Sequence, residues 1–251
     1  RRKHKLTVGR MLKITRVIVS LLLFAAMVLL LVTLESRIAT AFGWVARLQI
    51  FPLALSGAIT ALALWLGITL LFGRIYCSGM CPMGVLQDIF IRSGRLTRRS
   101  RMRRRFRYSS PRNKTRYTIL TIVAGSAVMG LTFFPSLLDP YSAFSRIGSE
   151  ILLPGVQWLS GNLAFRRGRL ICNTVCPVGA TLGLFSRWSL FHFDIDTDLC
   201  VNCRKCEHVC KAECIDVESH VVDGSRCVNC FDCVDACDSH ALRYTTRRKR
   251  L

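Results

Sequence analysis

The stretch GRIYCSGMCPMG, residues 73–84, closes a long apolar run and has a close counterpart in GRLICNTVCPVG, residues 168–179. Both copies place a Gly-Arg pair before two cysteines in the pattern Cys-x-x-x-Cys-Pro, with a glycine two residues after the proline. Proline and glycine at these positions favour a break in helical structure at the cysteines. The two copies therefore predict a duplicated unit that contributes two pairs of thiols.

The composition is typical of an inner-membrane protein. The chain has 251 residues, of which 51% are hydrophobic, and yet its formal net charge is +21. High hydrophobicity with excess positive charge fits a protein whose basic loops lie on the cytoplasmic side of the membrane. It also has 13 cysteines at tight, fixed spacings, and this odd, clustered set favours metal ligation over disulfides.

Three uncharged apolar runs, at 17–34, 48–73 and 117–138, approach or exceed the roughly 20 residues that a membrane-spanning helix needs. A fourth crossing is required between 139 and 165 if the basic RRGR at 166–169 is cytoplasmic. The only apolar segment there, 151–165, is short and contains proline, glycine, asparagine and glutamine. Either it is a distorted helix packed inside protein, or part of a span is absent from this chain. We expect a polytopic helical bundle with three clear spans and this fourth crossing.

The basic residues predict the orientation. Residues 1–16 and the loop 92–116 carry seven and twelve Lys or Arg, respectively, and no acid. The positive-inside rule places both segments in the cytoplasm, so we expect a multi-pass protein of the cell inner membrane. Nucleic-acid binding is the alternative for the loop, but it lies between two spans and no DNA-binding fold is recognisable. We therefore expect a lipid partner and no nucleic acid.

Residues 191–251 contain nine cysteines and form a second domain with an internal repeat. CVNCRKCEHVC at 200–210 and CVNCFDCVDAC at 227–237 share the spacing of bacterial two-cluster ferredoxins, whose fourth cysteine ligates the cluster of the other repeat. Zinc knuckles, the alternative, usually have two cysteine pairs with a longer spacer. We expect two [4Fe-4S] clusters: the first is held by Cys200, Cys203, Cys206 and Cys237, and the second by Cys227, Cys230, Cys233 and Cys210.

Two positions in this domain depart from the usual pattern. Lys211 and Asp238 replace the proline that normally follows the fourth cysteine, which changes backbone stiffness and removes no ligand. Cys214 aligns with Ala241 across the repeat, so we interpret it as a small apolar residue beside a cluster, with a ligand role as the less favoured alternative.

The remaining cysteines are Cys77, Cys81, Cys172 and Cys176. Together they bring four thiols to one membrane face, enough for a third iron–sulfur cluster. The alternative is that both pairs are structural or redox-active thiols without metal. Because the pairs arise by duplication, we favour shared ligation.

The motifs together resemble one family, the membrane-bound polyferredoxins of the NapH/NosR type. They are GRIYCSGMCPMGVLQD (73–88), LDPYSAFSRI (138–147), GRLICNTVCPVG (168–179) and the two cysteine repeats. KAECID at 211–216 resembles a branch in which the extra cysteine is usual. The resemblance implies four or more spans, cytoplasmic clusters, and electron transfer between quinol, cytoplasmic donors and extracytoplasmic redox partners.

We therefore expect a mainly α protein: a transmembrane domain at 1–190 and a cytoplasmic α+β two-cluster ferredoxin domain at 191–251. Its function would be electron transfer as a subunit of a respiratory or quinone-linked complex, with flavin, haem or iron–sulfur partner subunits and a quinone. No histidine lies in an apolar run and no G-x-G-x-x-G occurs, so haem and nucleotide sites would belong to partners. The alternative is a maturation factor that reduces a metal centre or disulfide of a client enzyme.

Overall fold

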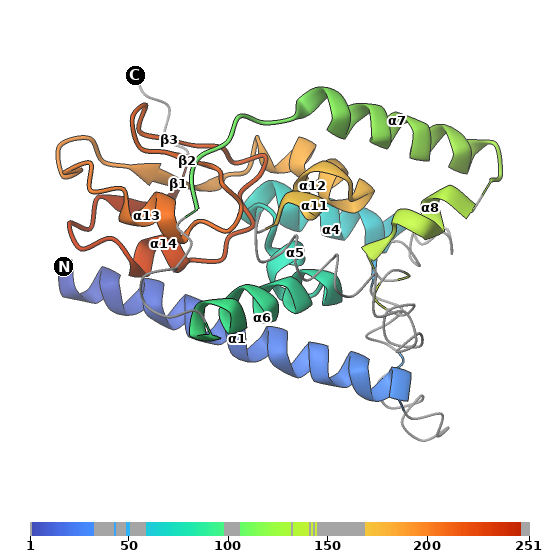
Figure 1. Cartoon of the computed structure of the whole chain (residues 1–251), viewed down its shortest axis with the longest axis horizontal. Coiled ribbons are helices and arrows are strands. Elements are labelled where there is room, and N and C mark those ends of the chain that lie inside the picture. The colour runs from blue at the N-terminus through green and yellow to red at the C-terminus, as the bar shows by residue number, and fades with distance from the viewer. Residues whose placement is uncertain are drawn as a thin grey trace.

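The computed structural model describes residues 2–32, 43, 49–50, 59–97, 106–131, 133–140, 142, 144 and 169–246. Most of this part of the chain is helical, and its strands are confined to a cysteine-rich lobe, residues 191–246 (Figure 1). The predicted mainly α architecture is confirmed. The helices outside the lobe are α1 (Arg2–Val32), α4 (Ile59–Phe72), α5 (Ile75–Gly79), α6 (Pro82–Thr97), α7 (Asn113–Val128), α8 (Phe133–Leu138), α11 (Leu170–Thr174) and α12 (Pro177–Ser186). The lobe contains β1 (Phe191–Ile195), α13 (Lys205–Val209), β2 (Ile215–Asp216), β3 (Val221–Val222), α14 (Asp232–Asp235) and β4 (Leu242–Thr246).

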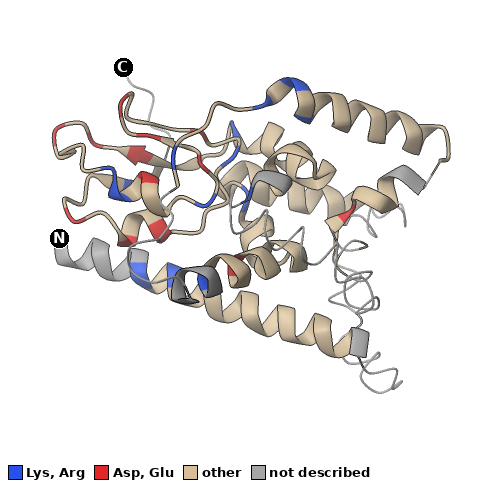
Figure 2. Cartoon of the chain, in the orientation of Figure 1, with Lys and Arg blue, Asp and Glu red and all other residues tan. Residues whose placement is uncertain are grey.

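Among the described residues, α1 is the one helix long and apolar enough to cross a membrane, over Arg10–Leu30. Most of its apolar side chains in this stretch are exposed, and Leu22 for example is 65% exposed, although Met27 is buried. Figure 2 shows charged residues along the lobe and on the described parts of α1 and α7 nearest to it, and uncharged ribbon over most of the rest of their described length. A large exposed apolar surface of this kind fits a lipid environment.

The third apolar run, 117–138, does not form one helix. Helix α7 ends in a Schellman motif, in which Leu131 N–H donates to Ser126 O at 2.9 Å and Gly130 N–H to Ala127 O at 3.1 Å. Gly130 has φ of 75°, a left-handed conformation that glycine adopts without steric cost. The run is therefore divided between α7 and α8. Residues 51–58 of the second run and the predicted fourth crossing at 151–165 lie outside the described residues, so those spans stay predictions.

The predicted helix breaks at the paired cysteines are confirmed. Helix α5 ends at Gly79 and α6 begins at Pro82, and 95 residues later α11 ends at Thr174 and α12 begins at Pro177. Proline suits the first position of a helix because its missing N–H would have no partner there. Both copies of the duplicated unit thus have the same local structure, a short helix, a break and a second helix.

The lobe is also built from two interlocked repeats. Strand β1 pairs with β4 in antiparallel register, and β2 pairs with β3. Asp194 on β1 pairs with Arg243 on β4. Val221 on β3 lies 27 residues after Asp194, Asp216 on β2 lies 27 residues before Arg243, and these two residues also pair with each other. Each sheet therefore combines one strand from each repeat, so neither repeat can form its sheet alone.

Cysteine side chains form much of the lobe's core. They pack with Phe193, Ile195, Ile215 and Leu242, all of them buried. Domains this small are only marginally stable on apolar packing alone, and many add disulfides or metals. All thirteen cysteines fall within the described residues, and none of them forms a disulfide.

Asp88 on α6 connects α1, the second copy of the duplicated unit and the lobe. Its Oδ1 lies 2.9 Å from Arg169 Nη2, and its Oδ2 lies 3.2 Å from Lys211 Nζ and 3.5 Å from Arg16 Nη1. Burial alone would raise the pKa of Asp88, but these three cations outweigh it and hold that pKa well below its usual range. Lys211 continues the chain of charges, since its Nζ also lies 2.7 Å from Asp232 on α14.

We predict that Asp88→Asn destabilises the protein by about 3–5 kcal/mol, because it leaves Arg169 and Lys211 buried with less opposing charge. Thermal unfolding of the detergent-purified chain, followed by circular dichroism, measures the change. Asp198→Asn is the control: it neutralises an exposed carboxylate and is expected to change stability by no more than about 0.5 kcal/mol. Equal unfolding midpoints for the two variants would contradict the role assigned to Asp88.

Candidate functional site

Four cysteines of the lobe line one cavity with an apolar wall that includes Ile195, Val217 and Leu242. They are Cys200, Cys203, Cys206 and Cys237, here called the first lobe quartet. Burial, together with the other three thiols, raises the pKa of Cys206 to about 11. Three members come from the first repeat and the fourth from the second, the arrangement that the ferredoxin spacing predicts.

A second set of lobe cysteines surrounds Cys233. Burial raises the pKa of Cys233 well above its ordinary value, and the nearby Cys230, Cys227 and Cys210 raise it further. These four residues, here called the second lobe quartet, again combine three cysteines of one repeat with one of the other. Cys206 of the first lobe quartet also acts on Cys233, so the two quartets adjoin.

The loops that carry these cysteines have matching backbone conformations. Asn202 and Arg204 have φ of 51° and 57°, and their counterparts Asn229 and Phe231 have φ of 51° and 60°. Arginine and phenylalanine seldom adopt positive φ, so the loop imposes it. Alternation of right- and left-handed residues turns successive N–H groups to one side and makes anion-binding concavities, including those of iron–sulfur sites. The lobe loops therefore suit an anionic centre.

Cys214 lies beside the second lobe quartet. It is buried and its sulfur is 3.5 Å from the sulfur of Cys210. The hydrogen bond with Cys214 lowers the pKa of Cys210. Ala241 occupies the equivalent place in the second repeat and is also buried. This placement is consistent with the interpretation of Cys214 as a small residue packed beside the quartet.

The structure brings together the two cysteine pairs of the duplicated unit. Burial raises the pKa of Cys81 well above its ordinary value, and Cys172, Cys77 and Cys176 raise it further. Burial also raises the pKa of Cys176, followed by Cys172 and, less strongly, Cys77. These four residues, here called the helix-side quartet, thus lie close enough to act on one another.

Two glycines allow the helices to approach these cysteines. A Cβ atom at Gly84 would lie 2.3 Å from the carbonyl oxygen of Cys77, and one at Gly179 would lie 2.1 Å from that of Cys172. Any side chain would therefore push α6 or α12 away from the cysteine pair that precedes it. This contact explains why both copies of the motif continue to Pro-x-Gly.

The arginines of the two Gly-Arg pairs cross between the copies. Arg169 Nη1 donates to the carbonyl oxygen of Cys77 at 2.8 Å. In return, Arg74 donates from Nη2 to the carbonyl oxygen of Cys172 at 3.5 Å and from Nη1 to Asn173 Oδ1 at 2.8 Å. Both arginines are 0% exposed. In this arginine exchange, each copy holds the first cysteine of the other in place.

The charges of the two arginines are balanced differently. Arg169 pairs with Asp88, whereas among the described residues Arg74 has no carboxylate partner. Arg74 instead donates to the Ser225 carbonyl oxygen at 3.1 Å and contacts Cys77 Sγ at 3.6 Å, and its Nε has no partner. A guanidinium buried without an opposing charge is costly. The surroundings of the helix-side quartet therefore favour negative charge.

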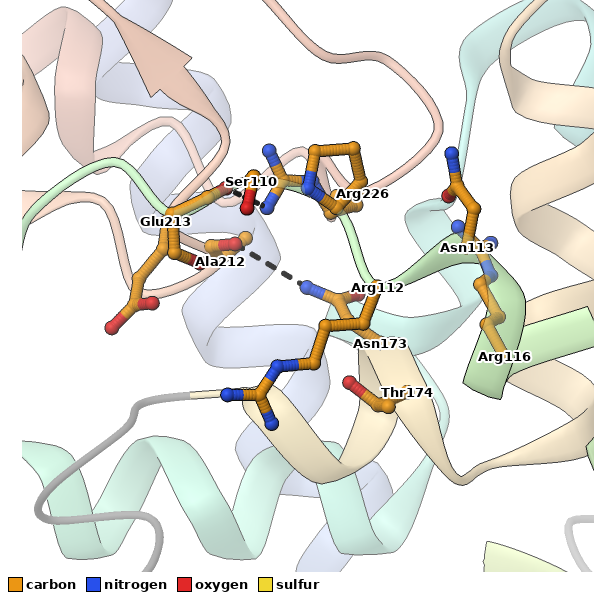
Figure 3. A pocket seen from close by; sticks show the side chains of 11 residues that line it. Ser110, Arg112, Asn113, Arg116, Asn173, Thr174, Ala212, Glu213 and Arg226 are labelled. Carbon is orange, nitrogen blue, oxygen red and sulfur yellow. Dashed lines mark hydrogen bonds between the residues drawn. The ribbon is translucent and has the colours of Figure 1, made fainter.

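A hollow between α7, α11 and the lobe adjoins this region (Figure 3). Across it, Asn173 donates to Ala212 O at 3.4 Å, and Arg226 Nη1 donates to Ser109 O at 2.6 Å. Figure 3 shows Arg116 and Arg226 on opposite walls, with the Glu213 carboxylate turned away from both. The first of these hydrogen bonds joins the lobe directly to the residue that follows Cys172, and the second joins the lobe to the loop before α7.

Sequence reasoning missed the buried ions. The Gly-Arg pairs looked like basic groups at a membrane surface, but both arginines are buried. The sequence predicted only that Lys211 changes the stiffness of the backbone. Its side chain is in fact 2% exposed and bridges Asp88 and Asp232. The one signal in the sequence was the identical Arg-x-x-Cys spacing of the two copies.

No group of three or more His, Cys, Asp or Glu side chains among the described residues could hold one metal ion. A cubane binds each thiolate to a different iron, so its ligands lie further apart than those of a single ion. The cysteine-only donor sets suit iron–sulfur clusters.

The chain matches a family described as a 4Fe-4S binding domain at residues 53–105 and 163–196. Each matched segment contains one pair of the helix-side quartet. The chain is 29% identical over 182 residues to the methylamine utilization ferredoxin-type protein MauN of Paracoccus denitrificans, and the match covers 68% of this chain and 58% of that protein. It is 30% identical over 189 residues to the ferredoxin-type protein NapH of Escherichia coli, covering 69% of this chain and 61% of that protein.

A third relative is the regulatory protein NosR of Stutzerimonas stutzeri, which is 24% identical over 160 residues, covering 61% of this chain and 22% of that protein. The chain thus spans about three fifths of the length of MauN and of NapH. No solved structure matches it. The resemblance expected from the motifs is confirmed.

We predict that Gly179→Ala lowers the iron content by about four atoms per chain, because its Cβ would collide with the Cys172 carbonyl oxygen and displace α12. Metal analysis of anaerobically purified protein measures the loss. Gly125→Ala on α7 is the matched control, since nothing lies within 4 Å of the added Cβ. The full iron content in Gly179→Ala would refute the proposed need for a glycine there.

Proposed function

Because the chain is a ferredoxin-type protein of the NapH/NosR kind with a 4Fe-4S binding domain, we propose that it relays electrons through three [4Fe-4S] clusters at a membrane surface. The two lobe quartets hold two clusters, as in a two-cluster ferredoxin domain, and the helix-side quartet holds the third. Each cluster supplies a reversible one-electron step when bound. The protein's own residues position the clusters, bury them and set their surrounding charge.

The adjacency of the three quartets carries this proposal. Cys206 and Cys233 link the first lobe quartet to the second. Cys230 of the second lobe quartet packs against the apolar core that contains Cys77 and Cys81. Arg169 interacts electrostatically with both Cys172 and Cys230. The quartets therefore lie in sequence from the lobe to the helices, an arrangement that suits electron transfer from each site to the next.

The surrounding charge supports a cluster at the helix-side quartet in preference to four free thiols. Burial raises the pKa of Cys172 to about 11, so as a free thiol it would be neutral and would leave Arg74 without an opposing charge. Thiolates bound to an anionic cluster would balance the buried arginine. The matched 4Fe-4S binding domain, which contains both cysteine pairs, agrees with this assignment.

We propose that the protein is a multi-pass inner-membrane protein with its lobe in the cytoplasm. The basic N-terminal part of α1 contacts the lobe, where Lys13 Nζ lies 2.9 Å and Arg10 Nε 3.3 Å from Asp235. The positive-inside rule assigns that end of α1 to the cytoplasm. The lobe is thereby accessible to cytoplasmic redox proteins, and the helices to a quinone or to membrane subunits with flavin, haem or iron–sulfur groups.

We predict about twelve irons and an equal amount of sulfide per chain after anaerobic purification, because three cubanes each contain four of both. Replacing Cys77 and Cys172 together by serine is expected to remove about four irons. Cys214→Ser is the control, a buried cysteine outside the three quartets, and is expected to retain them all. A zinc-only protein would refute the iron–sulfur assignment, and unchanged iron in the double variant would refute the third cluster.

Purification from native membranes in mild detergent tests the role in a complex. We expect stoichiometric co-purification of at least one redox subunit, identified by its flavin, haem or iron–sulfur spectrum. Isolation of the protein without such a subunit would instead favour a maturation factor.

A further inference from the structure

Arg74 is placed to control how readily the helix-side quartet's centre accepts an electron. Reduction adds one electron and one negative charge to the centre, with no bond made or broken at the cysteines. A nearby cation stabilises the reduced state and so raises the midpoint potential, because net charge and hydrogen bonds to sulfur tune such centres. Arg74 supplies both effects, since its Nη2 contacts Cys77 Sγ at 3.6 Å.

Burial makes this charge effective. Arg74 is 0% exposed, and the interaction between charges at low dielectric is several-fold stronger than in water. The cations near the lobe quartets are different, because each forms an ion pair with at least one carboxylate. Lys205 pairs with Asp238 at the surface, and Lys211 lies 2.7 Å from Asp232 and 3.2 Å from Asp88.

The unbalanced charge of Arg74 also affects a neighbouring arginine. Arg74 and Arg116 both donate to the Ser225 carbonyl oxygen, at 3.1 Å and 3.3 Å. Burial, together with the like charge of Arg74, lowers the pKa of Arg116 to about 10. The two guanidiniums therefore repel each other beside the helix-side quartet, and an anionic centre there would relieve that repulsion.

We propose that Arg74 raises the midpoint potential of the centre held by the helix-side quartet, while Arg169, which is ion-paired with Asp88, serves mainly to position Cys77. This inference rests on the proposed third cluster. It makes Arg74 a positioning and potential-setting residue with no part in ligation.

The test is a redox titration of the full-length protein, with chemical mediators and electron paramagnetic resonance detection of each reduced centre. The signal that is missing from the Cys77→Ser/Cys172→Ser variant identifies the helix-side centre. In Arg74→Gln, that centre's reduction equilibrium is expected to become at least tenfold less favourable, a downward shift of 59 mV for a one-electron couple. Arg74→Lys, which keeps the charge, should restore most of the potential.

Iron content and the midpoint potentials of the two lobe centres serve as fold controls. Neither is expected to change in Arg74→Gln, because glutamine keeps an N–H donor for the acceptors beside Cys172 while it removes the charge. Lys114→Gln removes an exposed cation from the start of α7 and should leave all three potentials unchanged. If Arg74→Gln keeps all three centres and the midpoint potential of its helix-side centre is unchanged, the inference is wrong and the proposed function still stands. Loss of the helix-side centre in both Arg74 variants would also overturn it, in favour of a purely structural role. Absence of a third centre from the unmodified protein would refute the proposed third cluster itself.

Discussion

Arg74 and Arg169 each cross from one copy of the duplicated unit to the carbonyl oxygen of the first cysteine in the other. Neither has access to water, so their N–H groups depend on acceptors inside the protein, and those acceptors lie at the cysteines. This mutual dependence holds two segments 95 residues apart in one arrangement. Gly84 and Gly179 permit it by letting the following helices lie against the same carbonyl groups. The attachment of the lobe follows from it, because Asp88 balances Arg169 and also receives Lys211.

The two repeats of the lobe also depend on each other for their structure. Each of its two sheets takes one strand from each repeat, and each cysteine quartet takes three members from one repeat and one from the other. Both duplications in this chain are therefore interlocked and are not two independent units side by side. Such interlocking allows a small amount of chain to surround a site from two directions.

The local chemistry of the chain could be predicted from the sequence, whereas its long-range electrostatics could not. Fixed cysteine spacing determined which residues of the lobe meet, and Pro82 and Pro177 marked the helix breaks, because both signals act within a few residues. The 117–138 run looked like one helix by composition, but Gly130 closes α7 with a left-handed turn that hydropathy does not register. Arg74 meets Asn173, and Arg169 and Lys211 meet Asp88, across 81 or more residues of chain, and no spacing rule connects these pairs.

The arginine exchange also imposes an order on biosynthesis. Cys77, Cys81 and Arg74 leave the ribosome before Cys172, Asn173 and Arg169 have been made, and at 5–20 residues per second the delay is roughly 5–20 seconds. During that interval the first copy has two thiols and a cation whose partners do not yet exist. Ser225, which also accepts a hydrogen bond from Arg74, is synthesised later still because it belongs to the lobe. The helix-side quartet is thus completed only after Cys176 has been made, so any centre that it holds is assembled after both copies.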